Sequence, residues 1–153
     1  MNILNNLLLI NDRDIWAEFS AFLCEDAEEK HDNYSAIIAP APTKSHTSVS
    51  LREEHGERLA TDLLPRSEGR DITLLFAIVA ENPADYLTKY RAFIKFLKEG
   101  NKGWLQFNLP SLSLTMRCYY RRCTDVRQLT PIEGGSEQAA LLKVTFREPI
   151  SSF

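Results

Sequence analysis

Residues 83–99 have the repeat of an amphipathic helix. Asn82 is a favourable N-cap, Pro83 suits the first helical position, and Gly100 is the residue type that often ends a helix. Apolar side chains recur every three or four positions, so they gather on one face of the predicted helix. We expect this face to pack on a sheet, and it consists of Tyr86, Leu87, Tyr90, Phe93, Ile94 and Leu97.

The remaining faces of this helix carry different side chains. Arg91, Lys95 and Lys98 lie opposite the apolar face, where they meet solvent or a partner. Phe96 falls outside the apolar face, which places it either at the edge of the core or at a contact with another molecule. These four residues are therefore candidates for a subunit interface.

Period-two patterns and short apolar runs predict about seven or eight mostly antiparallel strands. Residues 70–80 are apolar on both faces, which is typical of a central strand covered on both sides. Residues 112–120 alternate cleanly, as in a half-buried strand. The fold class is therefore α+β and mainly β, a β-sandwich or barrel with the helix packed on it. Shorter strands are expected at residues 7–10, 34–39, 104–107, 125–129 and 142–146.

Two segments near the N-terminus are less regular. Residues 14–22 fit a strand, but Ile15, Phe19 and Phe22 also have helical spacing, so both interpretations stay open. Residues 25–33 are strongly acidic and are expected to form a loop with no buried face.

Residues 43–69 interrupt the strand pattern with a long polar stretch. Its large apolar residues are few: Val49, Leu51, Leu59, Leu63 and Leu64. Residues 48–51 alternate like one arm of an edge hairpin. Loops of this length are usually functional or disordered, so we expect a loop or hairpin excursion from the core of a single domain, 1–153.

Composition excludes several classes of protein. With 153 residues, 44% hydrophobic and 25% charged, the chain is neither disordered nor a coiled coil. The net charge of −3 excludes a polybasic nucleic-acid binder. Three cysteines make no disulfide framework and favour a reducing cytosol. The N-terminal apolar run at 7–10 is too short for a signal peptide or a membrane span, so we expect an intracellular protein.

No catalytic or cofactor motif is found in the sequence. A Gly-rich phosphate loop, a Gly-x-Ser-x-Gly elbow and a His-Glu-x-x-His zinc helix are all absent. His46 and His55 could bind a metal with Glu53 or Glu54, but solvated loop residues explain them better. Burial of Cys118 is favoured over a reactive thiol. We therefore expect no catalytic residue, no cofactor and no metal.

Charge is unevenly distributed along the chain. Residues 1–34 hold eight acidic and two basic residues, and residues 86–128 hold nine basic and two acidic ones. Opposite poles allow copies to stack head to tail into rings or filaments, although such segregation also arises by chance. The candidate subunit interface combines both poles with Phe96 and the leucines of the excursion: Glu25, Asp26, Glu28, Glu29, Leu59, Leu63, Leu64, Arg91, Lys95, Phe96, Lys98, Arg121 and Arg122.

An alternative interpretation concerns residues 117–122. This strand mixes Tyr119 and Tyr120 with Arg117, Arg121 and Arg122, as a groove for single-stranded nucleic acid can do. A solvated outer face of the sheet explains the same residues. The alternative function is thus a small β domain that binds single-stranded nucleic acid.

The order of these patterns is similar to that in phage distal-tail and tail-tube type proteins. Residues 9–15 resemble the opening hairpin of that family, and residues 70–76 its strand of the form basic residue, x, Ile, x, Leu after a long polar loop. The amphipathic helix, a strand introduced by Gly100, a tyrosine-bearing strand and a last strand ending in Glu148-Pro149 complete the resemblance. It spans nearly the whole chain.

The resemblance implies a phage-tail-like β-sandwich with one flanking helix, whose copies close into a six-fold ring around a channel. It also implies that long loops reach the next subunit. The expected function is a non-enzymatic structural subunit of a phage or prophage-derived tail. The expected partners are copies of itself, six of them by analogy with the family, and other tail proteins, with nucleic acid only as passing cargo.

The resemblance also bears on location and on the position in the tail. It implies assembly in the bacterial host cytoplasm and a final place in the virion tail, without a membrane or a small-molecule substrate. Many distal-tail proteins carry a second, carbohydrate-binding-like domain, which this sequence does not show. A minimal ring protein, a tube protein and a joining protein are all compatible with that.

Overall fold

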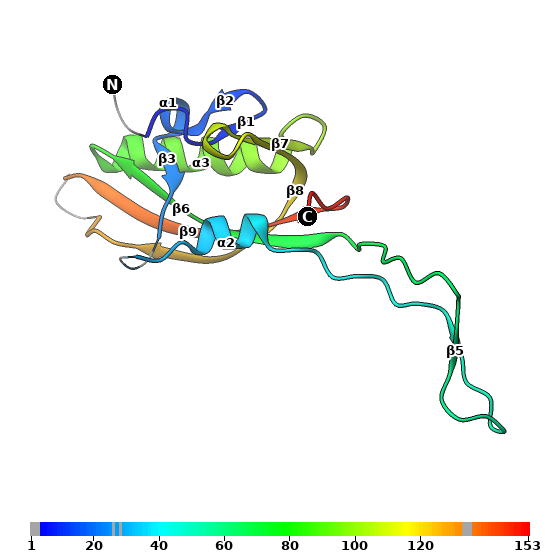
Figure 1. Ribbon diagram of the computed structural model, residues 1–153. Coiled ribbons are helices and arrows are strands. Elements are labelled where there is room, and N and C mark those ends of the chain that lie inside the picture. Colours follow the sequence, from blue (N-terminus) through cyan, green and yellow to red (C-terminus); the bar gives the residue numbers. More distant parts are fainter. Residues whose placement is uncertain (1–3, 26, 28, 133–135) are drawn as a thin grey trace.

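The framework of the protein is one curled sheet of seven strands, in the order β2-β1-β7-β8-β9-β6-β3. The computed structural model describes residues 4–25, 27, 29–132 and 136–153, and the pairings within this sheet are antiparallel (Figure 1). This confirms a mainly β, antiparallel fold. The strands are β1 Leu9–Ile10, β2 Arg13–Asp14, β3 Ala21–Leu23, β6 Arg70–Ala80, β7 Leu105–Leu109, β8 Leu114–Gln128 and β9 Gln138–Glu148.

The long strand β8 produces the curl. Its first part pairs with β7 up to Cys118, and its second part pairs with β9 from Tyr119 onward. Two irregularities in register, at Tyr120/Arg122 and Cys123/Asp125, bend the second part. The separate strand predicted at 125–129 is therefore wrong, because these residues continue β8 through its bulges. Leu112 belongs to the short 3-10 helix Pro110–Leu112 that precedes the strand.

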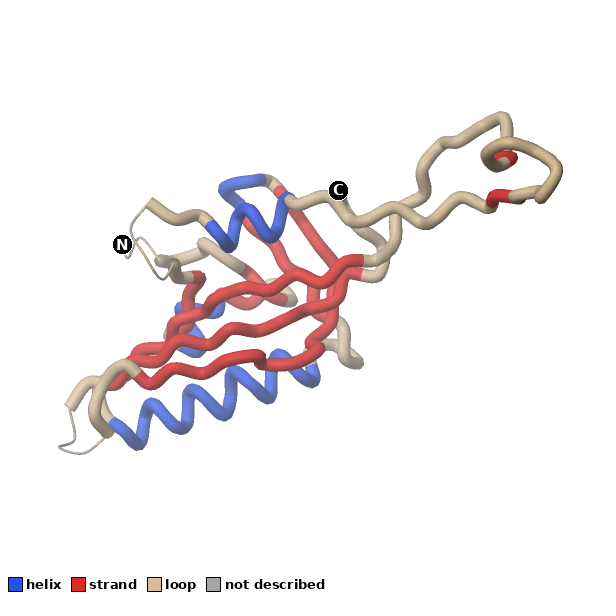
Figure 2. The backbone as a smooth tube through the Cα atoms, turned by 90° about the horizontal axis from the view of Figure 1, so that it is seen from below, coloured by secondary structure: helices blue, strands red, loops and turns tan. Residues whose placement is uncertain are grey.

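The predicted helix is present as α3, Pro83–Glu99, and it lies along the long strands (Figure 2). Asn82 Oδ1 accepts a hydrogen bond from the Asp85 amide at 2.8 Å, and Gly100 ends the helix at a φ of 46°. Phe93 and Leu97 are fully buried, and the Phe93 ring meets Phe76 of β6 edge-on at 5.5 Å.

Two apolar side chains of α3 are not fully buried in the core. Leu87 was expected in the packed face but is 46% exposed, and the fully buried side chains of α3, Phe93 and Leu97, lie in the second half of the helix. Phe96 is half-buried, with its ring stacked on Phe19 at 5.2 Å and the Arg13 guanidinium 4.7 Å from its centroid. It therefore lies at the edge of the core.

The structure shows which secondary structure residues 14–22 and 34–39 adopt. Residues 14–22 contain a helix and a strand: α1, Ile15–Phe19, is capped by Asp14, and Ser20, at a φ of 52°, turns the chain into β3. The strand predicted at 34–39 is wrong, because this segment is the helix α2, Asp32–Ile38.

Asn33 explains why α2 forms at the edge of the sheet. Beyond β3, the free edge of β6 is satisfied by the Asn33 side chain, whose Oδ1 accepts from the Leu75 amide at 2.8 Å and whose Nδ2 donates to the Leu75 carbonyl at 3.2 Å. Glu25 caps the helix by accepting from the Asp32 and Asn33 amides at 3.1 and 3.0 Å. Asn33 is 3% exposed, so the expectation of an acidic loop with no buried face is wrong at this residue.

Residues 43–69 form a long projection, called the arm below (Figures 1 and 2). Near its far end, β4 Ser48–Val49 and β5 Arg58–Leu59 pair antiparallel. At its root, Thr43 bridges Ser67. Every residue from 42 to 68 is exposed, so the arm makes no part of the hydrophobic core.

Candidate functional site

The root of the arm is fixed by a buried ion pair. Arg70, the first residue of β6 after the arm, is 4% exposed, and Glu148, at the end of β9, is fully buried. The distance between Arg70 Nη2 and Glu148 Oε2 is 3.1 Å, and Arg70 Nη1 donates to the Ala39 carbonyl at 2.5 Å. One guanidinium thus links the chain entering the arm, the chain leaving it and the last strand.

The C-terminal residues close over the same root. Glu148 Oε1 accepts from the Ser152 amide, and the Ala41 amide donates to the Phe153 carbonyl at 3.2 Å. The Phe153 ring lies 5.4 Å from the Arg70 guanidinium. Such contacts at both ends indicate that the arm leaves the body in a defined direction.

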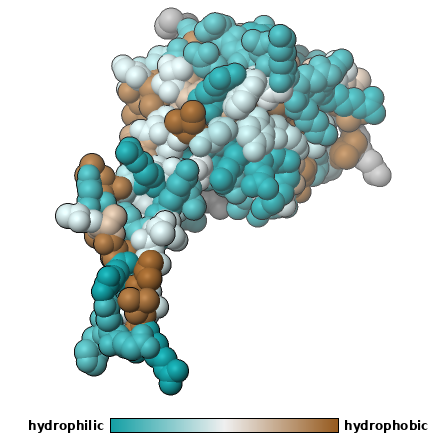
Figure 3. All heavy atoms as spheres, turned by 90° about the vertical axis from the view of Figure 1, so that its right-hand side faces the viewer, coloured by the Kyte–Doolittle hydropathy of each residue, from teal (hydrophilic) through white to brown (hydrophobic). Residues whose placement is uncertain are grey.

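The arm presents apolar side chains to solvent. Leu64 is 68% exposed and Val49 51% exposed, and Leu51, Leu59 and Leu63 are also exposed. Figure 3 shows apolar residues interleaved with polar ones along this projection. Glu54 and Arg58 form an ion pair across the hairpin. Apolar groups on a projection that the described chain does not cover are typical of a contact surface.

A groove runs between α3 and the bulged part of β8, and we call it the α3–β8 groove. Its volume is about 460 Å³. Partial burial raises the pKa of Tyr90, of Tyr120 and of the Cys123 thiol above their ordinary values. The ammonium of Lys98 lies 5.8 Å from the Tyr120 ring. The lining residues are Tyr90, Ile94, Lys98, Tyr120, Cys123, Thr124, Asp125 and Val126.

The predicted basic residues are divided between two faces of the sheet. Arg91, Lys95 and Lys98 line a shallow surface on the exposed side of α3. Arg121 instead contacts Asp71 at 3.2 Å, on the face of the sheet that α3 does not cover. Arg122 lies opposite Thr145 in the register of β8 and β9. The expected interface residues of the basic pole therefore belong to two separate surfaces.

On the outer face of the sheet, Asp71 is the shared ion-pair partner of Arg121 and Arg147. Burial acts to raise its pKa, but the hydrogen bonds and charges of Arg121 and Arg147 outweigh burial and hold the pKa of Asp71 below its ordinary value. Arg147 approaches Asp71 at 3.2 Å as well. The carboxylate thus remains charged and holds two arginines in place on the surface of the sheet.

An aromatic cluster lies on the outer face, and sequence patterns indicated only part of it. The Arg117 guanidinium lies 4.0 Å from the Trp104 ring centroid, and Tyr119 meets Trp104 edge-on at 5.9 Å. Tyr119 and Arg117 were singled out from the sequence, whereas Trp104 was assigned only to a strand. Tyr120 points instead into the α3–β8 groove.

The acidic candidates lie around the start of α2. Glu25 is engaged as the cap of that helix, and with Asp32 and Lys143 it lines a cleft of about 170 Å³. Glu29 is exposed and has a φ of 63°. Asp26 and Glu28, also expected at the interface, lie outside the described residues. Lys143, which is outside the predicted basic segment, adjoins the acidic residues in this cleft.

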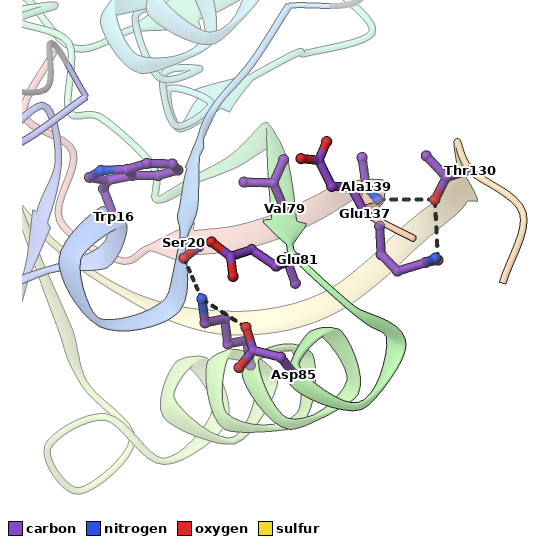
Figure 4. A pocket seen from close by; sticks show the side chains of 11 residues that line it. Trp16, Ser20, Val79, Glu81, Asp85, Thr130, Glu137 and Ala139 are labelled. Carbon is purple, nitrogen blue, oxygen red and sulfur yellow. Dashed lines mark hydrogen bonds and ion pairs between the residues drawn. The ribbon is translucent and has the colours of Figure 1, made fainter. Parts of the chain in front are cut away.

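Another cavity, of about 550 Å³, opens where α1, α3, the end of β6 and the start of β9 meet (Figure 4). The ammonium of Lys89 donates to Ser20 Oγ at 2.8 Å and pairs with Asp85 at 3.2 Å. Glu81 and Glu137 also border this cavity. The Lys89 contacts link the first turns of α3 to the α1–β3 corner.

We next consider whether the described residues could bind a metal ion and what state the three cysteines are in. The described residues contain no group of three or more His, Cys, Asp or Glu side chains placed to bind a metal ion. Cys24, Cys118 and Cys123 are all present as thiols. Burial, with a smaller contribution from the Glu148 charge, raises the pKa of Cys118 to about 12. Burial of Cys118, as predicted, is confirmed.

The architecture is that of a phage-tail-like β fold: a curled antiparallel sheet, one long helix packed on it and a projecting arm. The structure is similar to the crystal structure of the Dit protein of phage SPP1, described as a paradigm of the hub adsorption apparatus in phages that infect Gram-positive bacteria. The TM-score is 0.57 at 8% sequence identity, over 93% of this chain and 49% of that one. The resemblance to phage tail proteins is confirmed at the level of the fold.

The similarity to known proteins is confined to this structural level. No protein-family model and no curated protein matches the sequence. The chain spans about half the length of the Dit chain that it matches. In the part of the chain that the structure describes, no helix has the length and apolar character needed to cross a membrane.

Proposed function

We propose that this protein is a non-enzymatic structural subunit of a phage or prophage-derived tail and that it assembles with copies of itself into a ring. The observation that carries the proposal is the arm, a fully exposed projection with apolar side chains on a tail-like fold. The sequence resemblance suggests six copies. Other tail proteins are the further partners, and the location is the host cytoplasm during assembly and then the virion tail.

The arm suits a contact between unlike surfaces. A ring of identical subunits needs one patch that fits a different patch on the next copy. The arm supplies the first patch, because it extends beyond the body and is anchored only at its root by Arg70 and its neighbours. Burying its leucines would stabilise the contact by about 25 cal/mol per Å² of apolar surface removed from water.

Charge then has a secondary role in assembly. Exposed ion pairs contribute only about 0–1 kcal/mol each, so the predicted acidic and basic residues steer the approach of subunits more than they hold them. The apolar residues Leu59, Leu63 and Leu64 carry the affinity in this proposal. The half-buried Phe96 contributes less, since the Phe19 and Arg13 side chains already cover it.

Measurement of mass in solution tests the proposal directly. Light scattering of the full chain over a range of concentrations at low salt should give a mass well above 17.5 kDa, rising to a constant value for a closed ring. A variant in which a short Gly-Ser turn replaces residues 47–64 should stay monomeric. Unchanged circular dichroism and melting temperature would show that the body still folds. A full chain that remains monomeric at the highest concentration would contradict self-assembly.

Binding of single-stranded nucleic acid is the second candidate, and the Trp104–Arg117–Tyr119 cluster favours it. Bases can stack on exposed aromatic rings beside arginines. Here the Arg117 guanidinium already covers Trp104, so a base would have to displace it. Fluorescence anisotropy with a labelled oligothymidine separates the two functions. Tight binding by a strict monomer, lost in Trp104→Ala, would favour this second candidate.

A further inference from the structure

We propose that the α3–β8 groove is the acceptor for the arm of a second copy of this chain. The proposal rests on the proposed function, since it names the surface to which the arm binds during self-assembly. It assigns different surfaces to the two sides of the contact: the arm of one subunit and the groove of the next. Such a contact repeats around a ring.

The groove offers apolar walls beside polar groups such as Thr124 and Asp125. Its walls are formed by the rings of Tyr90 and Tyr120 and by Ile94, which are all half-buried. Val126, at its edge, is 48% exposed although it lies in a long strand. An insertion of leucine side chains would complete the burial of these groups.

The charged side chains in and beside the groove are more often basic than acidic, with Asp125 and Glu99 as the acidic ones. Lys98 lies within the groove itself, and Arg91 and Lys95 follow on the adjoining exposed side of α3. None of these three has an ion pair with a described residue, whereas Lys89, nearer the start of the helix, is paired with Asp85. A partner that carries apolar and acidic side chains together fits this arrangement.

The arm carries that combination. Leu51 and Leu59 are exposed on either side of the hairpin end, where Glu53, Glu54 and Glu57 are also found. Glu54 is engaged with Arg58, while Glu53 and Glu57 have no ion pair with a described residue. Arg52 lies beside Glu53, so the end of the arm carries leucines with a small excess of acidic side chains. The groove and the adjoining surface carry apolar side chains with a small excess of basic ones, since Asp125 and Glu99 accompany the three cations.

The direction of the arm indicates that the arm in the groove comes from a second copy of the chain. The arm continues β6 beyond the body and does not fold back along α3 (Figures 1 and 2). Fully extended, the chain from Leu59 to Ser67 at the root spans roughly 26 Å, which is enough to carry Leu59 beyond its own body to the surface of a neighbouring subunit. The C-terminal residues of the same chain are occupied at the root of the arm, where Phe153 contacts Ala41.

Cys123 provides the means to test this proposal, because a native thiol already lies in the groove. In the full chain carrying Leu59→Cys or Leu64→Cys, a short bismaleimide should link the arm of one subunit to Cys123 of the next. Covalent multimers should form up to the size of the assembly measured by light scattering. The links should vanish when Cys123→Ser is added, and Ser111→Cys, an exposed position away from the arm, should give none.

Each result separates the two proposals. Assembly with links that depend on Cys123 supports both. Assembly without such links overturns the groove as acceptor and leaves the proposed function in place. A monomer without links contradicts self-assembly itself. A monomer that is linked within one chain would show that the arm reaches its own groove, which overturns the second copy as occupant.

Discussion

Arg70 and Glu148 form a buried ion pair, with Nη2 and Oε2 3.1 Å apart, at the point where the arm joins the sheet. The two residues are 78 positions apart in the chain. Removing one partner leaves an uncompensated buried charge. We therefore expect Glu148→Ala to lower the free energy of unfolding by about 3–5 kcal/mol, measured by urea denaturation.

Two control variants make this prediction specific. The double variant Arg70→Met, Glu148→Leu should lose less than Glu148→Ala, because two apolar side chains leave no unpaired charge. Arg121→Ala breaks the exposed pair with Asp71 and should cost only about 0–1 kcal/mol. A loss in Glu148→Ala no larger than that in Arg121→Ala would show that the buried pair does not hold the root.

Packing of α3 on the sheet is tested by two leucines of the same helix. Leu97 is fully buried, so Leu97→Ala should destabilise the protein by about 2–5 kcal/mol. Leu87 is 46% exposed, and Leu87→Ala should change the free energy of unfolding by less than about 0.5 kcal/mol. Equal losses in both variants would mean that the helix presents a different face to the core.

The two leucines also show how far the sequence predicts this fold. Helical spacing placed both in one apolar stripe, and capping residues predicted the bounds of α3 correctly. Spacing contains no information about which part of the stripe is buried, and in the structure it is the second half of α3, with Phe93 and Leu97. Residues 70–80 do form a strand between two neighbours, β6 between β9 and β3, but the expectation that both of its faces are covered is wrong. Asp71 and Thr73 are exposed on the outer face, and Leu75 and Val79 are only half-buried there.

The failures have a common physical cause. The segment 34–39 is apolar and short, so it fits a strand as well as a helix; Glu25 and Asn33 decide the outcome through contacts made only in the folded chain. The candidate sites were also only partly predictable, because some of them depend on contacts made only in the folded chain. Sequence patterns found the arm leucines and the basic side of α3, but not the pairing of Arg70 with Glu148 or the groove between α3 and the bulged part of β8.

Thiol reactivity should distinguish Cys118 from Cys123. Burial raises the pKa of Cys118 to about 12, so this thiol stays protonated at pH 8 and is shielded from reagents. Burial raises the pKa of Cys123 as well, but Cys123 is only half-buried. With iodoacetamide at pH 8 and mass spectrometry, Cys123 should be alkylated first, and Cys118 only after unfolding. Prior modification of Cys118 in the native protein would contradict its burial.

Limited proteolysis should report the state of the arm. Trypsin should cut after Arg52, Arg58 or Arg66 well before it cuts the body, because every residue from 42 to 68 is exposed. Assembly should protect these bonds if the arm is held by a neighbour. The chain with the shortened arm, treated identically, gives the rate for the body alone. Cleavage of the arm and the body at equal rates in the monomer would rule out a free arm.

Charge reversal on α3 should weaken association without abolishing it. Arg91→Glu and Lys95→Glu together remove two rim cations worth about 0–1 kcal/mol each, so the association constant should fall by up to roughly thirtyfold at low salt. The wild-type constant should decline with added salt and then level off, since exposed charges are screened beyond about 8–10 Å while apolar contacts persist. Adding Glu53→Lys and Glu57→Lys to the double variant should restore part of the loss, as sedimentation velocity can measure. Reversal on the helix with no effect on association would place the acceptor elsewhere, because Lys95 and Arg91 adjoin the groove that the arm is proposed to enter.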